Sequence, residues 1–322
     1  MPESRQQLPL FSNDPQTQDD ITRRTALDAT FSLFAEYLRR EGKSQNTITA
    51  FLSDLRLVGQ YLGTDRTVGS IVTSDLERFL HWLEFDRGVP CSRKSYARRV
   101  TSLKVYFKWL KGLKVVAIDP AEAVLQRSGP APLSNVLSMD QIRAVTVAAH
   151  DFRKGEEQDY RPEMLFRLLV DTGIKKGEMA RLRPADIDRL NPNAPVMTIR
   201  HKSRNVYKER RIDLDPEWLK LYDLYMAQYH PVKDRKTGKP VETVITCTER
   251  NMEYILNDLG EAAGIPFKLS FEVLRWTCAV RDYRLGMEDQ ALREKLGLSE
   301  PSWHETSNKI RQLAEKLASS KR

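Results

Sequence analysis

The sequence has few cysteines and no long apolar run. Its three cysteines, Cys91, Cys247 and Cys278, lie far apart and are odd in number, which fits neither a zinc motif nor a disulfide framework. We therefore expect reduced thiols in a cytoplasmic protein, with no metal and no small-molecule cofactor. No apolar run approaches the roughly 20 residues that span a bilayer. The polar residues 1–20 also lack the apolar stretch of a secretory signal, so neither membrane insertion nor secretion is expected.

Acidic residues are outnumbered by basic ones. The 322 residues include 52 Lys and Arg against 44 Asp and Glu, which gives a net charge of +8 and a pI of about 9.3. Such a charge favours a polyanionic partner, and the lack of a basic amphipathic anchor helix argues against a membrane surface. With 40% hydrophobic residues, the chain has the composition of a globular protein and the length for two domains.

Apolar spacing predicts a small helical domain in the first part of the chain. Residues 1–26 contain few apolar side chains and are expected to form a mobile tail. Residues 27–117 repeat apolar residues at helical intervals. Polar residues typical of helix caps precede several of these repeats, so helices are expected near residues 31–38, 44–62, 73–85 and 92–110.

The last of these helices has an apolar side and a basic side. The apolar side runs from Tyr96 to Leu110. The basic side carries Arg93, Lys94, Arg98, Arg99, Lys104 and Lys108. A run of like charge is often only a solvated helix face, and the alternative is a surface that contacts a polyanion.

A second, mixed domain is expected after a linker. Residues 118–136 include a stretch rich in Pro, Gly and Ser, which is typical of a linker. Residues 137–322 combine helical periodicity with two short strand patterns that flank a basic turn. The fold class is therefore mainly α with a small β-sheet. The strands are expected at 196–199 and 211–214, and the helices from 138 and at 164–170, 216–229, 252–263, 272–285, 289–295 and 302–319.

Four short motifs follow one another in the second domain. They are Thr172–Glu178 (TGIKKGE), the basic turn with Lys202, Leu274–Thr277 (LRWT) and Leu296–Gly297. Their order and spacing, after a basic helical domain, resemble the tyrosine recombinases of the phage integrase family over about residues 27–315. The resemblance implies a SAM-like core-binding domain and an α+β catalytic-type domain. It also implies double-stranded DNA as the partner and assembly of homo-oligomers on DNA.

The chemistry of that family joins a tyrosine to a backbone phosphate. Two arginines clamp the phosphate oxygens with paired donors, and a lysine and histidines move protons. By resemblance, Lys175 stands at the first arginine, Lys202 is the hairpin lysine and Arg275 is the second arginine. Lysine at the first position keeps the positive charge but loses the planar fork of donors.

Three positions of this chemistry are altered. The family's first histidine falls on Glu272, its second on Leu298, and its nucleophile near Ser307. An ionised carboxylate cannot donate a hydrogen bond, and leucine has no polar group. No tyrosine follows Tyr283 in the sequence. The resemblance therefore implies that the positive groups, Lys175, Lys202 and Arg275, are kept while the nucleophile and both histidines are lost.

The resemblance also implies where DNA is contacted. The basic helix is expected to face the duplex through Arg93, Lys94, Arg98, Arg99 and Lys104, and the hairpin through Arg204, Lys208 and Arg210. Most of these contacts should be to phosphates, which position DNA without reading its sequence. For Arg275, an alternative role is a structural ion pair with Glu272 or Glu178.

Three hypotheses for the function remain open. The first is a nucleoid-associated protein that binds double-stranded DNA in recombination or integration without cleaving it. The second is an active recombinase with unorthodox or partner-supplied catalytic residues. The third is a helical protein-interaction scaffold, which would not show the steep salt dependence that phosphate contacts impose on DNA binding.

Overall fold

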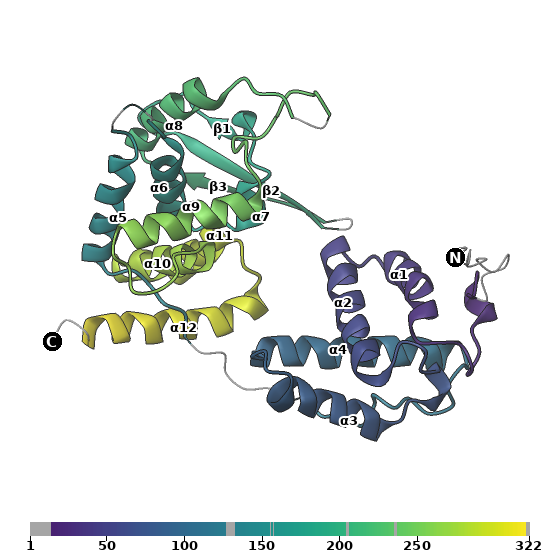
Figure 1. The fold of residues 1–322 in the computed structure, drawn as a ribbon. Coiled ribbons are helices and arrows are strands. Elements are labelled where there is room, and N and C mark those ends of the chain that lie inside the picture. The colour runs from purple at the N-terminus through teal and green to yellow at the C-terminus, as the bar shows by residue number, and fades with distance from the viewer. Residues whose placement is uncertain are drawn as a thin grey trace, which may run out of the picture. The chain divides into compact units, whose positions relative to one another are not determined.

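The computed structural model describes residues 14–126, 133–154, 156, 158–203, 206–234 and 237–319. The chain forms two compact units, Met1–Ala131 and Pro132–Arg322, and each has its own hydrophobic core (Figure 1). The division falls within the linker expected over residues 118–136. The described part of the chain is mainly helical with one three-stranded sheet, which confirms the predicted fold class. Within that part, no helix is long and apolar enough to cross a bilayer.

Serine caps begin two helices of the first unit where the sequence predicted them. The hydroxyl oxygens of Ser44 and Ser92 accept hydrogen bonds from the main-chain N–H three residues later, at 3.2 and 3.1 Å. The third helix begins at Thr73 and continues into a π-helical turn, Trp82–Asp86. The α-helices described in this unit are α1 (Phe31–Arg40), α2 (Gln45–Leu62), α3 (Thr73–His81) and α4 (Arg93–Gly112).

Aromatic rings fill the centre of the first unit. Phe34, Phe79 and Tyr106 are fully buried. The rings of Phe34 and Tyr106 meet edge to face with their centroids 5.1 Å apart, an arrangement that aromatic pairs prefer. The hydroxyl groups of Tyr106 and Thr30 lie 2.6 Å apart, so the buried phenol keeps a hydrogen-bond partner. These contacts hold α1 against α4.

The segment before α1 is folded against the first unit. Ile21 is 5% exposed and belongs to the core, and the Gly69 N–H donates to the Arg23 carbonyl at 3.0 Å. A Cβ atom at Gly69 would meet atoms of Arg23 at 2.6 to 2.9 Å, so this close approach requires glycine. The prediction of a mobile tail is therefore wrong for residues 21–26. A single buried isoleucine and main-chain pairing leave no periodic signal in the sequence.

Helix α6 lies at the centre of the second unit, where it packs against α5, α8, α9 and α10 (Figure 1). Its helical neighbours form largely where the apolar periodicity predicted them, and the short helix α7 was not predicted. The helices described in this unit are α5 (Met139–Asp151), α6 (Arg161–Thr172), α7 (Lys176–Met179), α8 (Pro216–Tyr229), α9 (Glu249–Ala262), α10 (Phe271–Arg284), α11 (Asp289–Leu296) and α12 (Glu300–Ser319).

The sheet is antiparallel, with the order β1-β2-β3. Its strands are β1 (Ile187–Asp188), β2 (Val196–Ser203) and β3 (Val206–Asp213). Met197 pairs with Ile187 on one side and with Ile212 on the other, and all three side chains are buried in the core. Strands β2 and β3 continue beyond the apolar segments predicted as strands, because the basic residues of the hairpin also pair.

Helices α10, α11 and α12 share a separate apolar cluster in this unit. Ala279, Leu292, Leu296 and Ile310 are each at most 1% exposed within it. Helix α12 lies along α10 (Figure 1). This packing places the helix that carries Ser307 beside the helix that carries Arg275.

Candidate functional site

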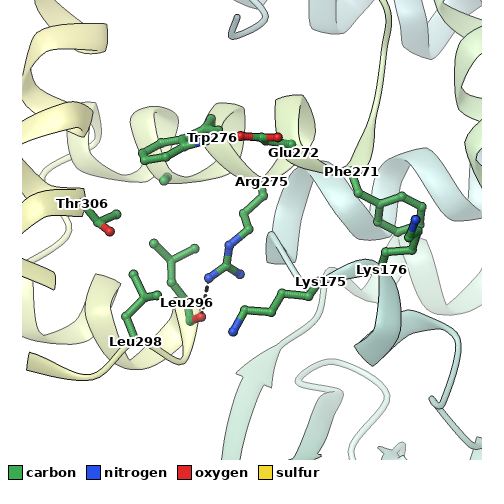
Figure 2. A pocket seen from close by; sticks show the side chains of 10 residues that line it. Lys175, Lys176, Phe271, Glu272, Arg275, Trp276, Leu296, Leu298 and Thr306 are labelled. Carbon is green, nitrogen blue, oxygen red and sulfur yellow. Dashed lines mark hydrogen bonds between the residues drawn. The ribbon is translucent and has the colours of Figure 1, made fainter. Parts of the chain in front are cut away.

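A pocket of about 360 Å³ lies between α10, α12 and the segments that carry Lys175 and Leu298 (Figure 2). Four of the positions that sequence reasoning assigned to chemistry line it: Lys175, Glu272, Arg275 and Leu298. The fold therefore brings together two cations that are 100 residues apart in the chain. The other lining residues are Lys176, Phe271, Trp276, Ala279, Leu296 and Thr306.

One face of α10 forms a wall of the pocket. Glu272, Arg275, Trp276 and Ala279 follow one another at intervals of three, one and three residues, which places them on the same side of an α-helix. The hydroxyl oxygen of Ser270 accepts a main-chain N–H three residues later at 3.3 Å and so fixes where this helix begins. Sequence reasoning used Glu272 and Arg275 but missed Trp276 as a pocket residue, although its helical phase is the same.

Arg275 joins three segments through main-chain carbonyls. Its Nη1 donates to the Gly173 oxygen at 2.5 Å and its Nη2 to the Leu296 oxygen at 2.6 Å. Burial lowers the pKa of Arg275, and the positive charge of Arg210 lowers it further against the opposing effect of Glu178. The alternative of a structural ion pair with Glu272 or Glu178 is corrected, because main-chain oxygens hold the guanidinium instead. Two of its five N–H donors are used in this way.

The side chain of Lys175 points into the same pocket. In Figure 2 it extends beside the guanidinium of Arg275, towards the segment with Leu296 and Leu298. Burial lowers the pKa of Lys175, and the neighbouring charge of Arg275 adds to this effect. A bound anion would offset both the cost of burying Lys175 and its repulsion from Arg275, since it would attract the two partly desolvated cations at once.

Glu178 and Arg210 form a buried ion pair beside the pocket. Arg210 donates from Nη1 to Glu178 Oε1 at 3.0 Å and from Nη2 to Oε2 at 2.7 Å, and its Nε donates to the Lys295 carbonyl at 3.0 Å. The two side chains are 5% and 13% exposed. Burial alone would raise the pKa of Glu178, but Arg210 holds it below its ordinary value. We therefore correct the prediction that Arg210 contacts DNA, because three of its five N–H donors bind groups inside the fold and its side chain is 13% exposed.

Thr306, and not Ser307, faces the pocket from α12. Ser307 is 7% exposed, and its hydroxyl donates to the His304 carbonyl at 3.2 Å. Thr306 lines the pocket, and its hydroxyl donates to the Ser302 carbonyl at 2.8 Å. The residue that faces the pocket from α12 is therefore one position before Ser307, because one residue turns a side chain by about 100° around a helix.

The basic hairpin is described only in part. The main chain of Lys202 pairs with Tyr207 between β2 and β3, but the side chain of Lys202 and all of Arg204 lie outside the described residues. Lys208 lines a second pocket of about 850 Å³ that shares Lys175 and Leu298 with the first. The two pockets therefore adjoin each other.

The basic side of α4 divides into exposed cations and cations that bond to other parts of the first unit. Arg93 and Lys94 are exposed and Lys104 is half-buried. Arg98 donates to Asp54 at 2.8 Å, and Arg99 donates to Cys91 Sγ at 2.8 Å with its side chain 13% exposed. The prediction that Arg99 contacts DNA is corrected, because its side chain is held inside the fold, whereas Arg98 pairs with Asp54 but keeps 39% of its side chain exposed.

Relatives of the chain are found through both sequence and fold. Residues 31–113 match the family model for the phage integrase N-terminal SAM-like domain. The tyrosine recombinase XerC of Mycobacterium bovis (strain BCG / Pasteur 1173P2) is 30% identical over 182 residues, which cover 56% of this chain and 60% of that protein. The chain is thus similar in sequence to the tyrosine recombinases. XerC of Mycobacterium sp. (strain JLS) is 28% identical over 165 residues, which cover 50% of this chain and 55% of that protein.

The chain thus spans less than two thirds of the length of these XerC relatives. Solved tyrosine recombinases share its fold over a longer range. A XerH recombinase bound to palindromic difH, in a post-cleavage complex, has a TM-score of 0.67 at 14% identity and covers 94% of this chain and 91% of its own. A lambda integrase dimer bound to a COC' core site has a TM-score of 0.65 at 14% identity and covers 90% of this chain and 77% of its own.

Arg99→Ala is expected to destabilise the first unit by about 1–3 kcal/mol, because it removes a buried donor beside the buried carboxylate of Asp54. Denaturant unfolding followed by circular dichroism measures the change. Arg93→Ala is the control, since Arg93 is exposed on the same helix and surface substitutions change stability by no more than about 0.5 kcal/mol. If Arg99→Ala lost DNA affinity while its stability stayed unchanged, Arg99 would be a DNA-contacting residue and not a structural one.

Proposed function

We propose that this chain binds double-stranded DNA in recombination or integration without cleaving the strand. It would hold a backbone phosphate in the pocket lined by Lys175 and Arg275, called the α10 pocket below. The observation that carries the proposal is the convergence of Lys175 and Arg275 on one pocket. The described residues that line it include no histidine and no tyrosine. On DNA in the cell, such a chain would associate with the nucleoid.

The burial of Lys175 and Arg275 and the remaining N–H donors of Arg275 favour phosphate binding. Both lie in a partly desolvated pocket, and burial lowers the pKa of each. The guanidinium of Arg275 has N–H donors beyond those that bind Gly173 and Leu296. Charge-assisted hydrogen bonds from such donors to phosphate are roughly twice as strong as neutral ones.

Cleavage needs groups that the described residues lining this pocket do not supply. A hydroxyl nucleophile needs a neighbouring base or a lowered pKa, and Thr306 already donates its proton to the Ser302 carbonyl. Glu272 repels a phosphate when it is ionised, and it has no proton to give. Leu298 offers no polar atom. The pocket therefore favours holding a phosphate over transferring it.

Exposed cations outside the pocket extend the DNA contact. Arg93, Lys94 and Lys108 on α4 are exposed, as is Lys208 on β3. We propose that they bind phosphates and give affinity without sequence preference. Solved relatives in DNA complexes support this partner, among them a lambda integrase tetramer bound to a Holliday junction. By the same likeness we propose that copies of this chain assemble on DNA.

A salt titration with duplex DNA tests binding. If the chain contacts about six phosphates, the logarithm of the binding constant should fall linearly with the logarithm of salt concentration, with a slope near −5. Fluorescence anisotropy of a labelled duplex between low and physiological salt measures this slope. A flat response would contradict phosphate contact and favour the protein-interaction scaffold.

A further inference from the structure

One wall of the α10 pocket is not explained by phosphate binding. Trp276 is half-buried and lines the pocket beside Ala279 and Leu298. A phosphate group occupies only a small part of a pocket of about 360 Å³, a volume within the range of small-molecule sites. An indole and an apolar wall next to two cations suit a ligand with a flat apolar part and one anionic group.

We propose that this pocket accepts a whole unpaired nucleotide, with its phosphate on Lys175 and Arg275 and its base against Trp276. The inference rests on the proposed phosphate site and names its ligand. Every nucleobase offers a π-face, and stacking on an aromatic side chain contributes about 5- to 150-fold in affinity per base. The same face of α10 carries the phosphate-binding guanidinium at 275 and the indole at 276, so one ligand can reach both.

Glu272 has a role in this arrangement that a simple phosphate site would not give it. It lies one helical turn before Trp276 on the same face of α10 and lines the same pocket (Figure 2). A carboxylate is unfavourable beside a bare phosphate, but it accepts hydrogen bonds from the exocyclic amino group of a base such as cytosine. The hydroxyl oxygen of Thr306, which lines the pocket from α12, is a further acceptor.

This ligand has two sources with the same chemistry. One is a free nucleoside monophosphate, and the other is an unstacked nucleotide within a bound DNA strand. An unpaired or mismatched nucleotide leaves the duplex at the lowest cost in stacking and pairing. The probes are therefore dCMP for the free ligand and a duplex with one cytidine opposite an abasic site for the strand.

Calorimetry on the full chain tests the inference. Binding of dCMP should be at least about fivefold tighter than binding of deoxyribose 5-phosphate, which has the phosphate but no base. Trp276→Leu should weaken dCMP binding about 5- to 150-fold, while Trp276→Phe keeps a ring and should retain most of the affinity. Equal binding of dCMP and deoxyribose 5-phosphate to the wild-type chain would overturn the inference, even if Trp276→Leu fails to fold.

Two DNA ligands, a duplex with one unpaired cytidine and a fully paired duplex, separate this inference from the proposed function. The duplex with the unpaired cytidine should bind more tightly than the fully paired duplex, and Trp276→Leu should abolish that difference. Paired-duplex binding without any preference for dCMP or for the unpaired cytidine would overturn the nucleotide pocket and leave the proposed function in place.

Discussion

Arg210→Met is expected to lower the free energy of unfolding of the second unit by about 3–5 kcal/mol, the cost of leaving a buried carboxylate without its partner. Glu178 is 5% exposed, and Arg210 supplies two hydrogen bonds to it. Methionine has a similar length, so the loss reports the missing charge and donors more than a cavity. Denaturant unfolding followed by circular dichroism measures the difference.

The ion pair of Arg210 and Glu178 also makes the free energy of unfolding of the second unit depend on pH. Arg210 keeps the pKa of Glu178 below its ordinary value near 4.5 in the folded state. The stabilisation is therefore fully present above that value and is lost as the pH falls through the lower, folded-state pKa. In Arg210→Met only the N–H and the charge of Lys175 still oppose the effect of burial on the pKa of Glu178, so acidification to about pH 4 should narrow the difference in free energy of unfolding between variant and wild type.

Arg211→Met is the matched control for this prediction. Arg211 is the next residue on β3, its side chain is 65% exposed, and its contact with Asp188 is 3.7 Å long. Exposed ion pairs contribute at most about 1 kcal/mol. Equal stability losses in Arg210→Met and Arg211→Met would show that the buried pair has no special role.

Arg275→Ala is expected to weaken binding of duplex DNA by about 10- to 100-fold, because it removes charge-assisted hydrogen bonds to phosphate. The change also leaves the carbonyls of Gly173 and Leu296 without this donor, so some stability is lost as well. Anisotropy titrations below the unfolding temperature of the variant measure affinity in the folded state.

Two further variants isolate the phosphate contact. Lys175→Ala removes the other cation of the pocket and keeps the main-chain bonds of Arg275, so it should lower the salt slope of DNA binding by about one unit. Lys220→Ala removes an exposed lysine on α8 that pairs with Glu217, and it should leave that slope unchanged. Wild-type affinity in a folded Arg275→Ala variant would contradict the assignment of Arg275 to phosphate.

The helical framework was predictable because its signals are local. Serine caps at Ser44, Ser92 and Ser138 accept the expected main-chain N–H groups, and α8 has the bounds that its apolar pattern and its proline predicted. The short strand β1 was not predicted, because a strand of two residues is too short to show the alternation of apolar and polar side chains.

The candidate site was predictable as a set of positions but not as a set of contacts. The order of motifs led to Lys175 and Arg275, and the fold brings them into one pocket. The pairing of Arg210 with Glu178, 32 residues away, and the contacts of Arg99 with Cys91 and Asp54 were not predictable, because they depend on how the elements pack. Spacing alone also placed Ser307 where the helical phase places Thr306.

We propose that this chain holds DNA without joining itself to it. A nicked suicide duplex tests this claim most directly, because loss of the short released strand traps any covalent intermediate. The duplex should be built on the sequence that the chain binds best, and products should be separated by denaturing electrophoresis. We expect a salt-sensitive complex under native conditions and no covalent protein–DNA adduct. A covalent adduct that disappears in Thr306→Ala or Ser307→Ala would contradict the account.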